Sequence, residues 1–397
     1  MSFDCVKVLW LVFPTRSAAL IARLFLFLAV SAAQTAIAQE TTNPKFAKWL
    51  KPMDWKRDSD QPVFTIGEKG KFDDQHILAP TVIYENGEYW MYYIGSQNDV
   101  IAKDVYKPAT ELTEEQKKKI RGNEHKDRIY KIGLAKSKDG IHFTKYDKNP
   151  VFSFGDDRKG ALTPNFLRNP DGSVLRENGR LIIYFTAADM PGDYKHNVHR
   201  ATSADGINWS APSAILLENA YAPYLMKEGD TYKMWFVDVS KRPWVLRYAD
   251  SKDGLKWSVN EKPCLLPKEQ KWEGAGGDRV TLPVIVYPSV FKADGIYIAL
   301  YGTYYEGQER TAIGLAVSED GLNWKKSEHN PVFKPEPKND WESNFTTSQT
   351  IMKLKDGSYR IWYAAREGPI PGTNPKDPGW AHMYYAIGTA HWVGPGR

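Results

Sequence analysis

Three acidic residues stand at the same distance before three different apolar segments of the chain. They are Asp73, Asp157 and Glu342, which lie seven residues before Pro80, Pro164 and Gln349 respectively. Carboxylates that face one cavity can act as general acid and general base, because their surroundings can move their pKa values apart. We therefore take these three acids as candidate catalytic residues.

A fourth acid and several polar or aromatic residues accompany this set. Glu218 precedes another such segment, which begins at Pro223, and is a further candidate acid. The side chains nearby that could bind a ligand are Asp74, His76, Arg158, Trp244, Asp278, Arg279, Tyr304, Tyr305 and Trp380. Aromatic faces among them suit stacking on flat apolar ligand surfaces. His76 could equally be a structural hydrogen-bonding group, a proton carrier or a metal ligand, and any of the acids could be a solvated loop residue.

One short phrase, Ser-x-Asp-Gly followed by two residues and an aromatic residue, occurs four times. Its copies are residues 137–143, 203–209, 251–257 and 318–324. An Asp-Gly pair between alternating segments is typical of a β-hairpin turn. We therefore predict a structural role in turns for the aspartates of these copies, Asp139, Asp205, Asp253 and Asp320.

A second unit recurs between these phrases and consists of an apolar strand, a polar turn and an aromatic-rich strand. Its five copies are residues 80–93, 164–185, 223–236, 288–301 and 349–363. Helical periodicity is nearly absent, so the two units together predict an all-β fold, a five-bladed β-propeller with four-stranded blades. In such a blade, the segment leading into the first strand lies on the same face as the loop between strands two and three. We therefore expect the candidate residues around a central funnel on that face.

The last copy has no fourth strand of its own before the C-terminus. The segment near residues 61–66 resembles the Asn-Pro-Val-Phe segments at 149–152 and 330–333, which follow two of the Asp-Gly phrases. We predict that residues 61–66 complete the last blade and close the ring, because an uncovered edge strand would invite aggregation. Residues 39–60 would then be an outer strap, and residues 61–397 the propeller domain.

The first forty residues have the order of a secretory signal peptide. Arg16 and Arg23 precede an apolar run at 24–32, and Ala-Ile-Ala at 36–38 provides a cleavage signal. We predict removal of residues 1–38 and a secreted or periplasmic mature protein. An uncleaved membrane anchor is the alternative, although the run is shorter than the ~20 residues that span a bilayer comfortably.

Composition excludes several other classes of protein. With 42% hydrophobic residues the chain is not disordered. Its 53 Lys and Arg against 48 Asp and Glu are interspersed, which excludes a nucleic-acid binder that works through bulk charge. Cys264 is the single cysteine beyond the predicted signal peptide, so the mature chain has no internal disulfide.

Two long segments fall between the second and third strands of predicted blades. They are residues 97–128 and 366–381. Long loops in a compact domain are usually functional or disordered. On the funnel face they would form walls or a lid, and we predict a lid-like insertion at 97–128.

The repeats, the Asn-Pro-Val-Phe segments and the run from Phe72 to Pro80 resemble the five-bladed β-propeller glycosidases. These include glycoside hydrolase families 43, 32, 117 and 130. The resemblance covers the whole mature chain, but its motifs are those of the superfamily rather than of one family. It implies a secreted glycoside hydrolase that cleaves a poly- or oligosaccharide of arabinan, xylan or exopolysaccharide type. It also implies a monomer with a carbohydrate substrate, with neither nucleic acid nor membrane as a partner. No cofactor would be required, although a central calcium ion could be bound.

Two positions depart from the pattern of family 43, in which a base, a pKa-modulating aspartate and a general-acid glutamate come from the first three blades. The Asp-Pro of the first inner strand is here Ala79-Pro80, and Tyr221 replaces the acid of the third blade. The catalytic carboxylates would therefore lie in the segments that lead into the blades.

The resulting hypothesis is hydrolysis by two carboxylates. Asp73 would act as base or nucleophile, Glu342 or Glu218 as general acid, and Asp157 would hold up the pKa of the acid. His76 is a substitute acid. A separation of roughly 6.5–9.5 Å across the funnel would favour inversion at the anomeric carbon.

Other functions stay open. A non-catalytic glycan-binding propeller would share the aromatic residues and the lid. A phosphorolytic enzyme would need a phosphate pocket, for which Arg158 and Arg279 are candidates, although export makes phosphorolysis less attractive. A sialidase is disfavoured because no triad of arginines stands out, and a protein-interaction propeller would require a plugged funnel. The sugar, the linkage, and endo or exo action do not follow from the sequence.

Overall fold

Strands make up nearly all regular structure in the described part of this chain. The computed structural model describes residues 43–74, 76–97, 130–155, 159–189, 196–274, 284–305, 310–367 and 384–396, without the side chains of residues 189, 305 and 310. The chain divides into residues 1–47 and residues 48–397, and every described strand belongs to the second unit. The helix α2 (Pro44–Trp49) crosses this boundary, and a short 3₁₀ helix, η2, covers Asp340–Glu342. No described helix is long and apolar enough to cross a membrane.

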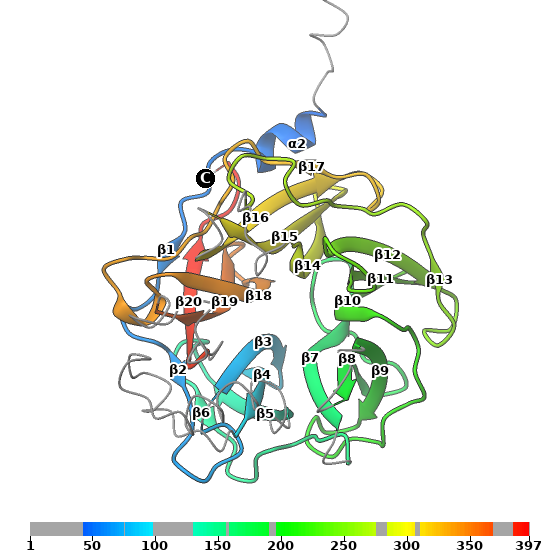
Figure 1. The fold of residues 1–397 in the computed structure, drawn as a ribbon, viewed down its shortest axis with the longest axis vertical. Coiled ribbons are helices and arrows are strands. Elements are labelled where there is room, and N and C mark those ends of the chain that lie inside the picture. Colours follow the sequence, from blue (N-terminus) through cyan, green and yellow to red (C-terminus); the bar gives the residue numbers. More distant parts are fainter. Residues whose placement is uncertain are drawn as a thin grey trace, which may run out of the picture. The chain divides into compact units, whose positions relative to one another are not determined.

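The strands fall into consecutive antiparallel groups, which we call repeats 1 to 5 (Figure 1). Repeat 1 contains β3 (His76–Glu85), β4 (Glu88–Ser96), β5 (Lys131–Ser137) and β6 (Thr144–Lys145). Repeat 2 contains β7 (Lys159–Arg168), β8 (Leu181–Asp189) and β9 (His196–Ser203). Repeat 3 contains β10 (Ala220–Glu228), β11 (Thr231–Asp238), β12 (Val245–Ser251) and β13 (Ser258–Val259).

Repeats 4 and 5 follow the same order. Repeat 4 contains β14 (Val286–Ala293), β15 (Ile296–Tyr305), β16 (Arg310–Ser318) and β17 (Lys325–Lys326). Repeat 5 contains β18 (Phe345–Lys353), β19 (Tyr359–Arg366) and β20 (Ala386–Trp392). The described chain therefore confirms the predicted all-β class and the predicted succession of antiparallel repeats.

The first strand of every repeat is interrupted at the same place. In β3, β7, β10, β14 and β18 the pairing register shifts by a bulge. Each bulge contains a non-glycine residue of positive φ, between 44° and 52°: Ala79, Thr163, Ala222, Tyr287 and Ser348. Such backbone is strained for these residue types, and bulges re-aim the neighbouring side chains. The five bulges line one common cavity, so the first strands meet around a shared axis, as predicted.

Each Asp-Gly turn contacts the preceding repeat through its glycine carbonyl. The turn of repeat 2 accepts a hydrogen bond from the Tyr92 hydroxyl at 2.9 Å, and that of repeat 3 accepts one from Tyr184 at 2.9 Å. The turn of repeat 4 accepts one from the Trp235 indole at 2.7 Å. The turn of repeat 1 accepts one from Trp362 of repeat 5 at 2.8 Å. The structural role predicted for these turns therefore includes fastening one repeat to the next.

The segment predicted to complete the last repeat does pair with it. β2 (Phe64–Thr65) is antiparallel to β20, with Phe64 opposite Ile387. β1 (Lys56–Arg57), in the predicted strap, pairs with the same strand further along. Between repeats 4 and 5 the strap also supplies Trp49, whose indole donates a 2.9 Å hydrogen bond to Asp294 and packs against Tyr359.

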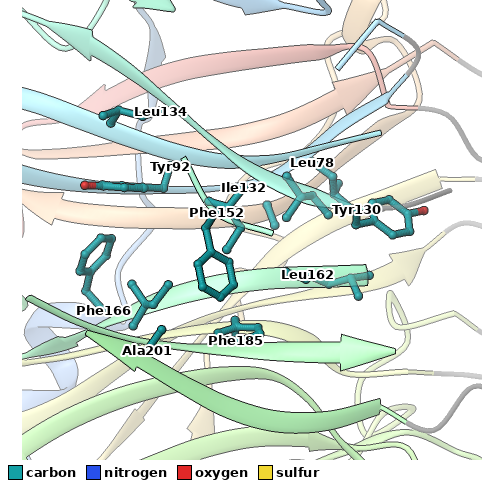
Figure 2. Packing of buried hydrophobic residues seen from close by; sticks show 14 of the residues in the cluster. Leu78, Tyr92, Tyr130, Ile132, Leu134, Phe152, Leu162, Phe166, Phe185 and Ala201 are labelled. Atoms are coloured by element: carbon teal, nitrogen blue, oxygen red, sulfur yellow. The ribbon is translucent and has the colours of Figure 1, made fainter. Parts of the chain in front are cut away.

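Aromatic and aliphatic side chains fill the spaces between repeats. Figure 2 shows the cluster between repeats 1 and 2, where Tyr92 and Ile132 meet Phe166 and Phe185. Phe152, which follows the Asp-Gly turn of repeat 1, packs edge-on against Phe185 at 5.0 Å between ring centroids. Burial of such large apolar surfaces is the main stabilising contribution to the fold. The repeats are therefore held as one body, and their first strands have defined places around the axial cavity.

Candidate functional site

The axial cavity itself is small and polar. Its volume is about 30 Å³, far below the roughly 300 Å³ of an ordinary small-molecule site. The side-chain oxygens of Asn165 and Gln349 line it, and both are buried without a hydrogen-bond partner in the structure. A water molecule fits there, whereas a sugar ring does not. A larger ligand could therefore bind only at an end of this cavity.

Aromatic side chains gather at the end of the cavity where the first strands begin. We call this set the mouth cluster; its members are His76, Tyr130, His196, Tyr221, Tyr287, Tyr304 and Tyr384. The hydroxyl groups of Tyr221 and Tyr287 lie 2.8 Å apart in a hydrogen bond. The cluster joins strands of repeats that are distant in the sequence.

The mouth cluster offers neutral phenol groups and one histidine whose tautomer is constrained. Burial raises the pKa of Tyr304 to about 12 and raises those of Tyr221, Tyr287 and Tyr384 as well. These phenols are therefore protonated at neutral pH and can donate hydrogen bonds to a ligand. His76 is buried, and its Nδ1 accepts a 2.9 Å hydrogen bond from the backbone N–H of Tyr384. In a neutral ring the proton is then on Nε2.

Positive charge lies beside these rings. The Arg366 guanidinium lies 3.6 Å from the centroid of Phe345 and 5.3 Å from that of Tyr384, and Arg366 is buried. Arg242 lies 3.7 Å from the centroid of Trp244. A guanidinium that stacks on an aromatic face keeps its positive charge, although the aliphatic part of its side chain is buried. Arg366 and Arg242 could therefore contact electronegative groups of a ligand.

Glu367 is a carboxyl group next to Arg366 that the sequence reasoning did not single out. It follows the last residue of β19 and is half-buried. Burial raises its pKa, the nearby Asp340 raises it further, and Arg366 opposes them. A raised pKa keeps a carboxyl protonated to a higher pH, which is the direction that a general acid requires. Its position at the start of the long 366–381 segment was the signal that could have drawn attention to it.

Asp73, one of the predicted catalytic acids, is hydrogen-bonded to two side chains of repeat 1. It is 2% exposed, and its Oδ2 accepts hydrogen bonds from the Tyr93 hydroxyl at 2.9 Å and from Lys145 Nζ at 2.6 Å. Tyr93 belongs to the second strand of the repeat and Lys145 to the fourth. Asp73 does not line the axial cavity.

Glu342 has the same surroundings in repeat 5. It is fully buried and accepts hydrogen bonds from the Tyr363 hydroxyl at 2.7 Å and from Arg57 Nε at 2.6 Å. Asn339 donates a further one at 2.6 Å. Tyr363 again lies on the second strand, and Arg57 belongs to β1, which pairs with β20.

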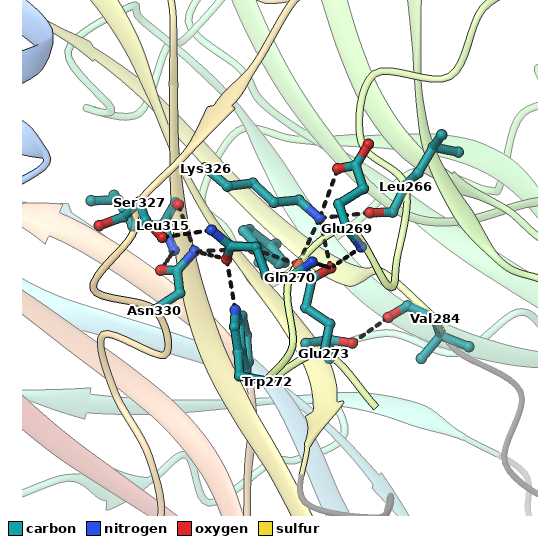
Figure 3. Close-up of polar contacts among 12 residues, drawn as sticks. Leu266, Glu269, Gln270, Trp272, Glu273, Val284, Leu315, Lys326, Ser327 and Asn330 are labelled. Atoms are coloured by element: carbon teal, nitrogen blue, oxygen red, sulfur yellow. Dashed lines mark hydrogen bonds and ion pairs between the residues drawn. The ribbon is translucent and has the colours of Figure 1, made fainter. Parts of the chain in front are cut away.

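A third carboxylate in this arrangement, Glu273, was missed from the sequence. It is 1% exposed and accepts hydrogen bonds from the Tyr301 hydroxyl at 2.9 Å and from Lys326 Nζ at 2.6 and 2.8 Å. Figure 3 shows Lys326 between Glu269 and Glu273, with Trp272 beside them. Glu273 lies fifteen residues before Pro288 rather than seven, so the spacing rule did not reach it. The aromatic–acid pairs Phe72-Asp73, Trp272-Glu273 and Trp341-Glu342 were the signal that could have found it.

We call each of these three arrangements a clamp: a buried carboxylate, a tyrosine of the second strand and a cation from a short strand that pairs with the third, β6, β17 or β1. The equal spacing of Asp73 and Glu342 thus has a structural explanation. A carboxylate held by a cation and a phenol inside a repeat is poorly placed to exchange protons with a ligand at the mouth. The catalytic role of these two acids stays a prediction, and their contacts favour a structural one.

The remaining predicted site residues are spread out. Glu218 is exposed just before β10, and Asp74 is half-buried and accepts a 2.7 Å hydrogen bond from the backbone N–H of Gly70. Trp244 is half-buried, and Tyr305 ends β15 without a described side chain. Those that lie outside the described residues are Asp157, Arg158, Asp278, Arg279, Trp380 and all of the 97–128 insertion except residue 97. Among described residues no group of three or more His, Cys, Asp or Glu could hold a metal ion, and the predictions about calcium and cofactors stay predictions.

Known proteins similar to this chain act on sugars or are uncharacterized. No protein-family model matches. A 1,2-beta-oligomannan phosphorylase of Thermoanaerobacter sp. (strain X514) is 23% identical over 324 residues, which cover 79% of this chain and 95% of that protein. An uncharacterized protein of Mycobacterium tuberculosis (strain ATCC 25618 / H37Rv) is 22% identical over 268 residues, covering 66% of this chain and 77% of that protein.

Solved structures show the same fold at lower identity. A glycoside hydrolase has a TM-score of 0.62 and 13% identity, and covers 89% of this chain and 96% of its own. A thermostable family-43 glycoside hydrolase has a TM-score of 0.56 and 15% identity, with 82% and 91% covered. The resemblance to β-propeller glycosidases is thereby confirmed at the level of the fold.

Proposed function

We propose that this chain is a glycan-acting enzyme that cleaves glycosidic bonds at the mouth of a five-bladed propeller. Repeats 1 to 5 are its blades, and the pairing of β2 with β20 closes the ring. The observation that carries the proposal is the mouth cluster, which combines flat aromatic faces with neutral phenol donors. This is the chemistry that binds a sugar ring, apolar on its faces and rich in hydroxyl groups at its edge.

The reaction we propose is hydrolysis through two carboxylates. Glu367 is the proposed general acid, because its half-buried carboxyl has a raised pKa and lies beside Arg366. Asp157, which the sequence places just before β7, is the proposed second carboxylate. Asp73 and Glu342 are given a structural role instead, on the contacts described above. Removal of residues 1–38 and export of the mature chain complete the proposal.

Phosphorolysis is a second candidate, favoured by two observations. A relative that spans 79% of this chain is a 1,2-beta-oligomannan phosphorylase, and Arg366 and Arg242 bring positive charge beside the mouth cluster. Phosphate would then take the place of water as the nucleophile, and arginine is suited to bind it.

One experiment separates these functions. The chain from residue 39 onward would be incubated with β-1,2-linked mannooligosaccharides, arabinan, xylan and bacterial exopolysaccharides, with and without inorganic phosphate. Reducing sugar released without phosphate is expected for a hydrolase, and sugar 1-phosphate formed only with phosphate would identify a phosphorylase. Binding without turnover on every substrate would establish a glycan-binding propeller and contradict the proposal.

A Glu367→Gln variant tests the assignment of the acid. We expect its kcat to fall by roughly 10²–10⁴-fold, because the general acid of the leaving group is lost. Glu336→Gln, at a half-buried acid in the segment between β17 and η2, is the control and should keep its activity. Full activity of Glu367→Gln would remove Glu367 from the mechanism.

A further inference from the structure

We propose that Glu273 is a positioning residue and that the three clamps fix residues 72–74, 272–274 and 341–344, the described lead-in residues before β3, β14 and β18, beside the mouth of the cavity. The effect on catalysis rests on the proposed function, whereas the effect on the local structure does not. Each clamp joins a lead-in segment to the second strand of its repeat and to a short strand paired with the third, and each carboxylate is at most 2% exposed. The lead-in segment can therefore leave its position only if a buried charge loses its partner.

Each clamp carboxylate lies close in sequence to a residue that contacts the mouth. Gly274, directly after Glu273, donates a 2.7 Å backbone hydrogen bond to the carbonyl of Tyr304. His76, three residues after Asp73, accepts the N–H of Tyr384. Phe345, three residues after Glu342, lies under the Arg366 guanidinium. On all three segments a mouth contact therefore lies within three residues of the clamp carboxylate.

The tyrosine and the aromatic neighbour of each acid require space that a glycine provides. A Cβ on Gly314 would come within 2.5 Å of Tyr301 and 2.9 Å of Trp272. A Cβ on Gly388 would meet Tyr363 at 2.5 Å and Trp341 at 2.6 Å. Both distances are closer than non-bonded carbons approach, so the clamp and the third-strand glycine depend on each other.

The tyrosine of each clamp is protonated at neutral pH and donates its hydroxyl hydrogen to the carboxylate. Burial and the adjacent carboxylate together raise the pKa values of Tyr93, Tyr301 and Tyr363 well above the ordinary value. If one partner of such a buried set is truncated, the others remain buried without a hydrogen-bond partner. The resulting loss in the free energy of unfolding is much larger than the net stabilisation that the intact pair provides.

The chain contains a matched control for Glu273. Glu228 accepts hydrogen bonds from Lys233 and Lys292 at 2.5 Å and from the Tyr297 hydroxyl. The chemical partners are therefore the same as in a clamp. Glu228, however, is the last residue of β10, at the end of the first strand away from the mouth. The side chain of Glu228 is 28% exposed, whereas that of Glu273 is fully buried. A purely structural contribution should therefore appear in both variants, smaller in Glu228→Gln, whereas positioning of the mouth should belong to Glu273 alone.

The test compares Glu273→Gln with Glu228→Gln in the chain from residue 39 onward, first by amide hydrogen exchange. We expect faster exchange in peptides covering residues 270–274 and 297–305 of Glu273→Gln, and no change there in Glu228→Gln. Tyr301→Phe removes a single hydroxyl and provides a milder variant should Glu273→Gln fail to fold. Unchanged exchange at 270–274 in both Glu273→Gln and Tyr301→Phe would overturn the proposal.

The activity measurement is then made on the same proteins at a temperature well below all their unfolding midpoints. We expect kcat/KM of Glu273→Gln to fall by roughly 10- to 100-fold, as a small displacement of binding groups does, and that of Glu228→Gln to stay within about twofold. Equal losses in both variants would show that Glu273 acts only through stability. If the wild type turns over no glycan but the exchange result holds, the clamp stands and the proposed enzymatic function fails.

Discussion

Repeats 1, 4 and 5 differ from repeats 2 and 3 in how the space beside the second strand is filled. In the former, a lead-in segment inserts an aromatic residue and an acid, and the third strand has glycine there. In the latter, the third strand carries a large side chain at the corresponding position, His199 opposite Phe185 and Arg247 opposite Phe236. One volume is thus occupied in two ways, from the lead-in segment or from the third strand.

The large side chains of repeats 2 and 3 satisfy their polar groups locally. His199 stacks on Phe185 at 5.9 Å and an interplanar angle of 22°, and its Nδ1 lies 2.8 Å from the carbonyl of Ser213. Arg247 donates a 2.6 Å hydrogen bond to Asp238 and others to the carbonyls of Asn260 and Glu261. In repeats 2 and 3 a residue of the third strand therefore occupies the place that glycine leaves open in repeats 1, 4 and 5.

The largest effect should follow from removing a clamp cation. Lys326→Met leaves Glu273 charged, buried and without its cation, and we expect a loss of about 3–5 kcal/mol in the free energy of unfolding. Lys326→Arg keeps the charge and is the control. Denaturant unfolding measures both, and a loss below about 1 kcal/mol for Lys326→Met would mean that the clamp contributes little.

A smaller loss should follow from filling the space that the clamp needs. Gly314→Ala places a methyl group against Tyr301 and Trp272, and we expect a loss of about 1–3 kcal/mol from overpacking. Gly302→Ala in the adjacent strand is the control, since its Cβ would come no closer than 3.3 Å to any atom. If the two variants had equal free energies of unfolding, the claim that the clamp requires a glycine at position 314 would be contradicted.

The smallest effect should be common to both kinds of repeat, because all Asp-Gly turns have the same hydrogen bonds. Burial raises the pKa of Asp320, but the N–H groups of Asn323 and Leu322 lower it more, to about 2. In Asp205 the hydrogen bonds from Asn208 are the main cause of a lowered pKa. We expect Asp320→Ala and Asp205→Ala each to cost about 0.5–2 kcal/mol, as the loss of a helix cap does.

The pH dependence of that cost has a definite sign. A carboxylate whose folded-state pKa is lowered contributes stability above its unfolded pKa near 4, and this contribution is lost as pH falls toward about 2. The difference between wild type and Asp320→Ala should therefore be constant from about pH 5 to 8 and shrink below about pH 4. A difference that persists at pH 2 would show that the turn is not held by the charged carboxylate.

Much of the fold could be predicted because it depends on local patterns. Alternating strands and Asp-Gly turns recur along the chain. The sequence around Phe64 resembles the Asn-Pro-Val-Phe segments near the ends of other repeats, so its pairing could be predicted. The prediction of the site was less accurate, because it also relied on local patterns. Asp73 and Glu342 share a spacing, but spacing does not show whether a carboxylate meets a ligand or a lysine.

By itself, the sequence determined the all-β repeats and their turns, which follow from periodicity and turn chemistry within each repeat. It also determined the strand near Phe64 that pairs with the last repeat, because that segment resembles the ends of other repeats. Only the tertiary structure decided which acids are buried and what they bind. Glu342 meets Arg57 across 285 residues of chain, and Glu273 meets Lys326 across 53. Such contacts depend on which strands become neighbours, and the free energy of a buried charge depends on those neighbours rather than on its place in the sequence.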